Sequence, residues 1–231
     1  MAHAELGTVV ITGGASGLGA ATAAAVGAQG GTPVVLDRHE PAGGVEHEIV
    51  DLGDARAAEA AVERVAERHG SLGAVVTAAA MDVPAPFDRI EGERWDRIVA
   101  VNLIGTAAVV RAALPHLERS SGKVVTVGST LGLSAVSDAT AYCASKFGVV
   151  GFTRSLAVET AGRVGVTLLI PGGMQTAFFD GRPEQYRPPA EAQLNRPEDV
   201  AATILFSLRQ PPGCELREVV VCPSQESSWP P

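Results

Sequence analysis

Residues 12–19 read Thr-Gly-Gly-Ala-Ser-Gly-Leu-Gly, and they join an apolar run, residues 6–12, to an Ala-rich stretch, residues 17–29. Glycine adopts the tight backbone angles of a turn and lets a pyrophosphate approach the main chain closely. A helix that begins here offers free N–H groups and a partial positive charge at its N-terminus. The place of this glycine cluster between a strand and a helix therefore predicts a dinucleotide-binding turn. The residues assigned to cofactor binding are Gly13, Ser16, Gly17, Leu18 and Gly19.

Strand-like and helix-like stretches alternate along the rest of the chain. Apolar runs predict strands at residues 33–37, 47–52, 74–79, 123–127, 164–170 and 217–222, in addition to 6–12. Helical periodicity predicts helices at residues 54–69, 92–118, 140–162 and 197–208, in addition to 17–29. Continuous apolar runs indicate strands buried on both faces, and the alternation indicates parallel strands. We therefore predict an α/β fold: one domain over residues 1–223, a doubly wound parallel sheet of about seven strands with helices on both faces, and an extended tail at 224–231.

The composition indicates a large apolar core and excludes several classes of function. Of the 231 residues 46% are hydrophobic, and the formal net charge of −8 comes from interleaved acidic and basic side chains. A nucleic-acid surface needs clustered Lys and Arg, so no nucleic-acid partner is expected. The chain lacks an uninterrupted apolar stretch of about 18 residues, so no membrane span is expected either. The histidines are scattered and predict no metal site, and Cys143, Cys214 and Cys222 are expected to be free thiols in the cytoplasm.

Asp37 closes the second predicted strand and bears on the choice of cofactor. A carboxylate at this place accepts hydrogen bonds from the ribose hydroxyls of an adenosine and repels a 2′-phosphate, which favours NAD over NADP. A simple cap at the strand end is the alternative. Arg38 follows directly, and its guanidinium is able to receive such a phosphate instead. Both residues are assigned to cofactor binding, with NAD preferred and NADP as the second choice.

Tyr142 and Lys146 lie one helical turn apart in the predicted helix 140–162, so they share one face. A free tyrosine has a pKa of about 10, and a neighbouring cation favours the phenolate and lowers that value. On its own, this spacing fits an ordinary Tyr and Lys on a helix surface as well as it fits a catalytic pair. Ser129 adds to it, because it follows the strand 123–127 at the end where ligands bind in open α/β sheets. Asn102 adds a polar group inside an apolar helix, where it either bends the helix around a water or makes a core hydrogen bond.

Together these motifs resemble the short-chain dehydrogenase/reductase family, whose fold is Rossmann-like. The matching segments are TGGASGLG (12–19), Asp37, Asp51-Leu52, Asn102, Ser129, YCASK (142–146) and PGGMQT (171–176), in the family's order and over nearly the whole chain. The resemblance implies that Tyr142 is the general acid/base, that Lys146 lowers its pKa and binds the nicotinamide ribose, and that Ser129 orients the carbonyl. It also implies that Asn102 holds a water of the proton relay.

The resemblance extends to the remaining cofactor contacts. Asp51 and Leu52 would flank the adenine, Ala78 and Ala79 would lie along the cofactor, and Pro171, Gly172 and Thr176 would contact the nicotinamide. One segment departs from the family, which has Asn-Asn-Ala-Gly where this chain has Thr77-Ala78-Ala79-Ala80. The family's asparagines tie the central sheet together. Thr77 is expected to make part of that bonding, whereas Ala80 is expected to crowd the ribose.

The function that follows is hydride transfer between NAD(H) and a secondary alcohol or ketone. One alternative is a non-catalytic dinucleotide-binding regulator on the same fold, and another is an epimerase or dehydratase with a tightly held cofactor. Residues 177–196 are expected to form a flap over the substrate. Met81, Leu131, Leu133, Phe178 and Phe179 are expected to line an apolar pocket. The resemblance implies a homodimer or homotetramer, and Trp229 is expected to pack on the body or on a partner subunit.

Overall fold

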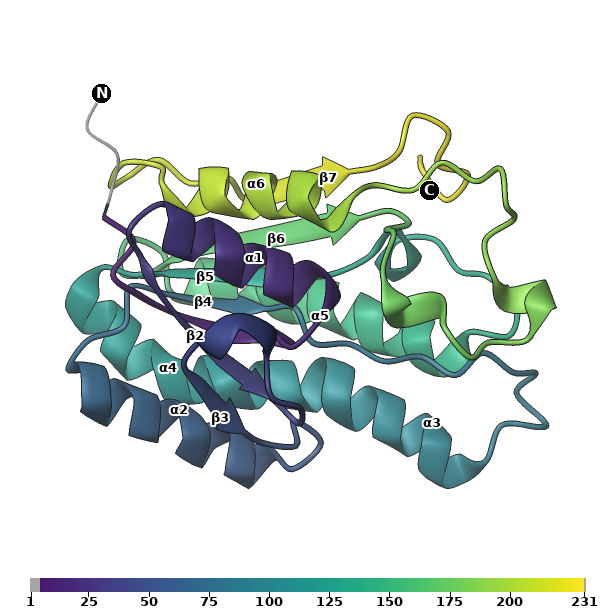
Figure 1. Cartoon of the computed structure of the whole chain (residues 1–231), viewed down its shortest axis with the longest axis horizontal. Coiled ribbons are helices and arrows are strands. Elements are labelled where there is room, and N and C mark those ends of the chain that lie inside the picture. Colours follow the sequence, from purple (N-terminus) through teal and green to yellow (C-terminus); the bar gives the residue numbers. More distant parts are fainter. Residues whose placement is uncertain (1–4, 231) are drawn as a thin grey trace.

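The computed structural model describes residues 5–230, and it confirms the predicted α/β fold with a doubly wound parallel sheet. Seven strands form one sheet in the order β3-β2-β1-β4-β5-β6-β7 (Figure 1). Their bounds are β1 Thr8–Thr12, β2 Thr32–Asp37, β3 His47–Ile49, β4 Ala74–Thr77, β5 Lys123–Val127, β6 Gly165–Pro171 and β7 Glu218–Val221. All neighbouring strands pair in parallel. The order reverses between β1 and β4, and the crevice at such a reversal is where ligands bind in this architecture.

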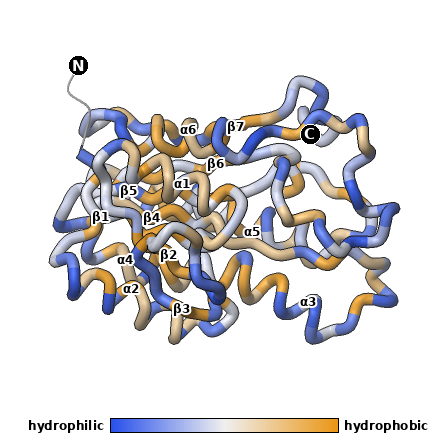
Figure 2. The backbone as a smooth tube through the Cα atoms, viewed as in Figure 1, coloured by the Kyte–Doolittle hydropathy of each residue, from blue (hydrophilic) through white to orange (hydrophobic). Residues whose placement is uncertain are grey.

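Helices cover both faces of the sheet (Figure 1). Their bounds are α1 Gly17–Ala28, α2 Ala55–His69, α3 Gly92–Val99, α4 Thr106–Ser120, α5 Thr140–Glu159 and α6 Pro197–Leu208. Alternate residues of β1 enter different cores: Val9 and Ile11 pack under α1 and α6, whereas Val10 packs under α2 and α4. This double burial explains why the inner residues of the central strands are apolar, whereas the edge strand β3 reads His-Glu-Ile. Figure 2 colours the whole backbone by hydropathy.

Several predicted elements differ from the observed ones at their ends or in their middle. The strands 47–52 and 74–79 are shorter than predicted, and end at Ile49 and Thr77. The predicted helix 92–118 is a continuous helical stretch with a π-helical segment, Ala100–Gly105, between α3 and α4. By length and composition alone the stretch 92–120 would suit a membrane span. Its apolar side belongs to the core, since Ile98, Val109 and Leu117 are fully buried.

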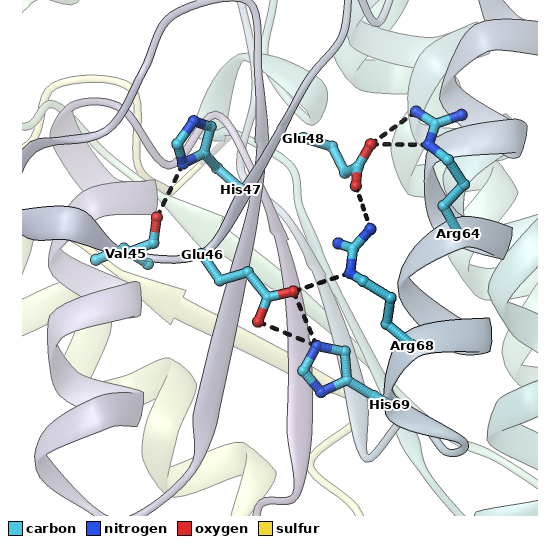
Figure 3. Close-up of polar contacts among 7 residues, drawn as sticks. All are labelled: Val45, Glu46, His47, Glu48, Arg64, Arg68 and His69. Atoms are coloured by element: carbon cyan, nitrogen blue, oxygen red, sulfur yellow. Dashed lines mark hydrogen bonds and ion pairs between the residues drawn. The ribbon is translucent and has the colours of Figure 1, made fainter.

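The β3 edge of the sheet carries a cluster of ion pairs with α2 (Figure 3). Arg68 pairs with Glu46 at 3.1 Å and with Glu48 at 2.5 Å, and Arg64 pairs with Glu48 at 2.7 Å. His69 Nε2 lies 3.0 Å from the carboxylate of Glu46. These five side chains, called the edge cluster below, tie the short edge strand to the helix beneath it.

Candidate active site

A cavity of about 940 Å³ lies at the carboxyl ends of the strands. Every residue assigned to cofactor binding lines it, and so do three of the four assigned to catalysis. These are Gly13, Ser16, Gly17, Leu18, Gly19, Asp37, Arg38, Asp51, Leu52, Ala78, Ala79, Ser129, Tyr142, Lys146, Pro171, Gly172 and Thr176. The exception is Asn102, which is buried behind the wall. Residues far apart in the sequence are therefore brought to one place: most lie at or after the end of a parallel strand, and Tyr142 and Lys146 come from α5.

The glycine turn has the shape that a dinucleotide requires. Gly13 has φ +71°, and a side chain at Gly19 would put its Cβ 2.2 Å from the Gly13 carbonyl oxygen. The first turn of α1 opens into the cavity through Ser16 and Gly17, so its free N–H groups face a ligand there. A bulkier turn would fill this space, and the residues present therefore fit a dinucleotide.

The carboxylate of Asp37 is fixed at the end of β2 by two backbone donors. Ala15 N donates to Oδ2 and His39 N donates to Oδ1, each at 3.0 Å. Nearby, Asp51 accepts from Gly53 N at 2.8 Å and pairs with Arg97 at 2.5 Å. The hydrogen bond from Arg97 lowers the pKa of the Asp51 carboxyl. This end of the cavity thus holds two oriented carboxylates, together with the side chains of Arg38 and Arg97.

Tyr142, Lys146 and Ser129 converge from α5 and from the end of β5. The Lys146 Nζ lies 5.7 Å from the centroid of the Tyr142 ring and donates to the Val127 carbonyl at 2.9 Å. Ser129 Oγ accepts from Leu131 N at 3.1 Å, and the Ser129 hydroxyl acts on the pKa of Tyr142 in the lowering direction. A substrate oxygen placed in the cavity would meet a phenol and an alcohol side by side, as proton transfer to or from that oxygen requires.

The expected effect of Lys146 on Tyr142 is not what this structure shows. Tyr142 lines the cavity and is half-buried. Burial raises the pKa of Tyr142 to about 12, and burial lowers the pKa of Lys146 to about 8. Desolvation outweighs the ammonium charge because Lys146 points to the Val127 carbonyl instead of to the hydroxyl. In this arrangement the phenol is protonated at neutral pH.

Asn102 makes core hydrogen bonds, one of the two roles that its mid-helix position suggested. Its side chain accepts from Met81 N at 2.8 Å, donates to Met81 O at 2.9 Å and donates to Ser145 Oγ at 3.0 Å. Its own carbonyl accepts from Thr106 Oγ1 at 2.9 Å within the π-helical segment. Asn102 therefore ties the loop after β4 to α5, and so positions the helix that carries Tyr142.

The departure at residues 77–80 leaves an unpaired group, contrary to the expectation for Thr77. Thr77 Oγ1 is buried and has no hydrogen-bond partner among residues 5–230. The tie between β1 and the segment after β4 comes instead from Thr12, whose Oγ1 accepts from Ala79 N at 3.1 Å. Thr12 pairs with Thr77 across the two strands. The segment after β4 is thus tied to β1 by a threonine of the neighbouring strand.

The segment after β6 folds over Tyr142 in two short 3₁₀ turns, Ala177–Phe179 and Glu184–Tyr186. The Phe178 ring lies 5.6 Å from the Tyr142 ring, and the guanidinium of Arg182 lies 4.5 Å from the Phe178 ring. Met81, Leu131, Phe178 and Phe179 line the cavity as expected. Leu133 instead packs against the cluster of Val149, Val150, Leu168 and Ile170. The flap thus brings a cation as well as apolar rings to the site.

Two groups of residues at the site have no signal in the sequence pattern. The first is the ion pair of Asp82 and Arg182, whose partners lie in different loops. The second is the tail, which forms turns at residues 224–225 and 227–228, whereas an extended tail was expected. Glu226 Oε2 accepts from Gly173 N at 2.8 Å, and Ser228 Oγ bonds Thr130 Oγ1 at 2.7 Å. Neither group follows a strand end or a helical repeat, so only the folded chain reveals them.

The geometry agrees with what is known of similar proteins. A family model described as short chain dehydrogenase matches residues 7–187. The chain is 31% identical to a 3-oxoacyl-(acyl-carrier-protein) reductase of Thermotoga maritima, over 85% of this chain and 88% of the relative. It is 34% identical to the cis-4-hydroxycyclohexanecarboxylate dehydrogenase of Sinomonas cyclohexanicum, over 85% of this chain and 87% of the relative.

Among solved structures, the fold resembles an alcohol dehydrogenase from the archaeon Thermococcus sibiricus complexed with 5-hydroxy-NADP, with a TM-score of 0.83. That match covers 93% of this chain and 95% of the other, at 23% sequence identity, and it bears on the fold alone. The family model and the relatives above 30% identity carry the assignment. The chain belongs to the short-chain dehydrogenase/reductase family of oxidoreductases.

Proposed function

We propose that the chain transfers a hydride between NAD(H) and a secondary alcohol or ketone, with Tyr142 as the general acid/base. The observation that supports this most is the convergence of Tyr142, Ser129 and Lys146 on one cavity with the glycine turn. The two relatives support it as well, since one is named a reductase of an oxoacyl group and the other a dehydrogenase of a hydroxycarboxylate.

The protein side of the reaction follows from these side chains. NAD⁺ held by the glycine turn and Asp37 would supply the acceptor for the hydride that an alcohol carbon loses when it becomes a carbonyl carbon, and the alcohol also loses the proton of its oxygen. Tyr142 takes that proton from the substrate oxygen, and Ser129 donates a hydrogen bond that orients the same oxygen. In the reverse direction Tyr142 returns the proton. Its protonated state at neutral pH is the form that carbonyl reduction needs.

Replacement of the phenol tests this proposal directly. Tyr142→Phe keeps the ring and its contact with Phe178 but removes the proton that is exchanged. We expect turnover to fall by at least about a hundredfold, the lower range for general acid/base catalysis, with NADH affinity kept. Activity would be followed through nicotinamide absorbance over a panel of alcohols and ketones. Tyr186→Phe removes the chain's other phenol and should stay within severalfold of the wild type. Near-wild-type turnover in Tyr142→Phe would refute the role.

The cofactor preference has its own test. Asp37 would bond the ribose hydroxyls, and its carboxylate would repel a 2′-phosphate. We expect the wild type to have the higher kcat/KM with NAD. Asp37→Ser should lose that preference and gain activity with NADP, because Arg38 is then free to meet the phosphate. A higher kcat/KM of the wild type with NADP than with NAD would contradict the proposed preference, and it would not bear on the proposed role of Tyr142.

A regulator without catalysis remains the second candidate for this fold. It would bind NADH and oxidise none of the alcohols in the panel. An epimerase or dehydratase would convert substrate without releasing NADH, which the same absorbance assay distinguishes.

We further propose a cytoplasmic homodimer or homotetramer. The exposed Phe147 and Val158 on α5 and Ile104 beside α4 offer apolar surface for such pairing. The mass in solution would decide the oligomeric state.

A further inference from the structure

The flap brings an ion pair close to the catalytic phenol. Arg182 Nη2 lies 3.1 Å from Asp82 Oδ2, and the two side chains are only 11% and 6% exposed. Asp82 stands in the loop after β4, and Arg182 stands in the flap between its two 3₁₀ turns. Both residues line the same cavity as Tyr142. The pair therefore joins the two loops that border the substrate end of the cavity.

This pair makes few of the hydrogen bonds that usually accompany buried charges. Nε and Nη2 of Arg182 are buried and have no hydrogen-bond acceptor within the described residues, although Nη2 is close to Asp82. The contact is Coulombic, without the parallel two-bond geometry that a carboxylate and a guanidinium prefer. Burial raises the pKa of the Asp82 carboxyl, so Arg182 compensates its desolvation only in part. Burying two charges in this way is costly unless their donors are satisfied.

Two aromatic rings hold the guanidinium in place. Its Cζ lies 4.5 Å from the Phe178 centroid and 4.9 Å from the Phe179 centroid, and Phe178 in turn contacts Tyr142. Arg182 is therefore one ring away from the phenol. When a guanidinium stacks its flat faces on aromatic rings, its N–H groups point outward in its own plane, where they are able to donate to a planar acceptor such as a carboxylate.

We propose that Arg182 binds an anionic group of the substrate, most simply a carboxylate, while Tyr142 acts on an alcohol or ketone of the same molecule. Asp82 occupies part of this anion site when substrate is absent and gives up Arg182 when it binds. The assignment rests on the proposed function and names its substrate class: hydroxycarboxylates and oxocarboxylates. A substrate carboxylate would accept hydrogen bonds from Nε and Nη2 of Arg182, the two donors that Asp82 leaves unpaired.

The test compares acids with neutral analogues of nearly the same shape. The probes are β-hydroxybutyrate and hydroxycyclohexanecarboxylates, each beside its methyl ester, with NAD as the oxidant. We expect the wild type to favour the acids in kcat/KM by about ten- to hundredfold, the usual weight of hydrogen bonds to a charged group. Arg182→Met should lose this preference mainly through KM, and Arg182→Lys should keep part of it. Asp82→Asn should lower KM for the acids relative to the esters, because it removes the competing carboxylate.

A matched control comes from the same stretch of chain. Arg196→Met removes an exposed arginine that faces Glu198, and it should leave the preference for acids unchanged. Binding without turnover provides a second measurement. Cyclohexanecarboxylate and its amide would be titrated calorimetrically into the NADH complexes of Tyr142→Phe and of Tyr142→Phe/Arg182→Met. The acid should bind the first more tightly than the amide does, and the second no better than the amide does.

The two measurements separate the two proposals. Binding of the acid that depends on Arg182, with no alcohol oxidised by the wild type, would support the anion site and refute the proposed function. Oxidation of acids and esters at equal kcat/KM, with no change of their ratio in Arg182→Met, would overturn the anion site and leave the proposed function in place. The pair of Asp82 and Arg182 would then be only a latch between two loops.

Discussion

The edge cluster and the pair of Asp82 and Arg182 use the same kinds of side chain in opposite ways. In the edge cluster, Arg68 of α2 bonds two carboxylates, and its side chain is 41% exposed (Figure 3). In the cavity, Arg182 meets a single carboxylate and is nearly buried. The first arrangement has bonded partners and is partly exposed to solvent, whereas the second has buried donors without acceptors in the described structure.

The difference concerns polar groups without partners. Four buried side-chain atoms have no hydrogen-bond partner in the described structure. Thr77 Oγ1 and two nitrogens of Arg182 lie at or near the carboxyl ends of the strands, whereas the fourth, Glu215 Oε2, lies before β7. Lys146 is also there, desolvated and with a lowered pKa. Exposed pairs contribute little to stability because water screens them. Unpaired groups in a cavity cost stability, and a bound ligand is what would offset that cost.

The largest expected effect concerns Lys146. Its pKa is about 8 in the folded chain and 10.5 ordinarily, so between these values the unfolded chain binds more protons. Stability should therefore rise with pH across that window, and the penalty should be complete below about pH 8. Between pH 8 and 10 we expect a gain of roughly 2 kcal/mol that Lys146→Met lacks. Urea unfolding at both pH values measures it.

Two features isolate this effect of Lys146. Lys123 is the chain's other lysine, and it is present in both the wild type and Lys146→Met, so its effect on the pH dependence of stability cancels in the comparison. Tyr142 has a pKa of about 12, and its opposite contribution begins only above its ordinary value of 10.0. Lys146→Gln is a second variant should the methionine fold poorly. Equal pH slopes in the wild type and both variants would show that Lys146 is not desolvated as described.

The next effect contrasts two threonines that face each other across β1 and β4. Thr77→Val removes a buried hydroxyl that has no partner, and it should raise the free energy of unfolding by about 1 kcal/mol. Thr12→Val removes the acceptor of the Ala79 amide, and it should lower that free energy by about 1 kcal/mol. Thermal and urea unfolding measure both. If the two substitutions shift the free energy of unfolding in the same direction, the Thr77 hydroxyl is not unpaired while that of Thr12 is bonded, and the contrast between them is refuted.

The smallest effect is expected in the edge cluster. Arg68→Gln removes pairs with Glu46 and Glu48 and should cost under about 1 kcal/mol, less at high salt. Hydrogen bonds from His69 and Arg68 lower the pKa of Glu46, so this contribution is present above pH 4.5 and is lost as the pH falls further. Unfolding at two salt concentrations, at neutral and acidic pH, measures it. If Arg68→Gln lowered the free energy of unfolding by several kcal/mol, the exposed ion pairs of the edge cluster would matter as much to stability as the buried groups of the cavity.

Much of the candidate site was predictable because it is built from strand ends. In a parallel sheet the carboxyl ends lie along one edge, so the turn at 12–19, Asp37, Ser129 and Pro171 had to come together once the strands were placed. Tyr142 and Lys146 follow from the helical repeat. The π-helical segment at Ala100–Gly105 was not predictable from the helical repeat, and neither were the hydrogen bonds that its Asn102 makes with Met81 in a distant loop.

The sequence by itself determined the order of strands and helices, the apolar cores on both faces and the identity of most cavity residues. These depend on local periodicity and on chain order, which sequence records directly. Only the tertiary structure decided that Arg182 reaches Asp82, that Glu226 returns to Gly173 and that Thr77 lacks a partner. It also decided that the pKa of Tyr142 is raised to about 12 instead of lowered, since a pKa depends on how much water and charge the folded chain leaves around the group.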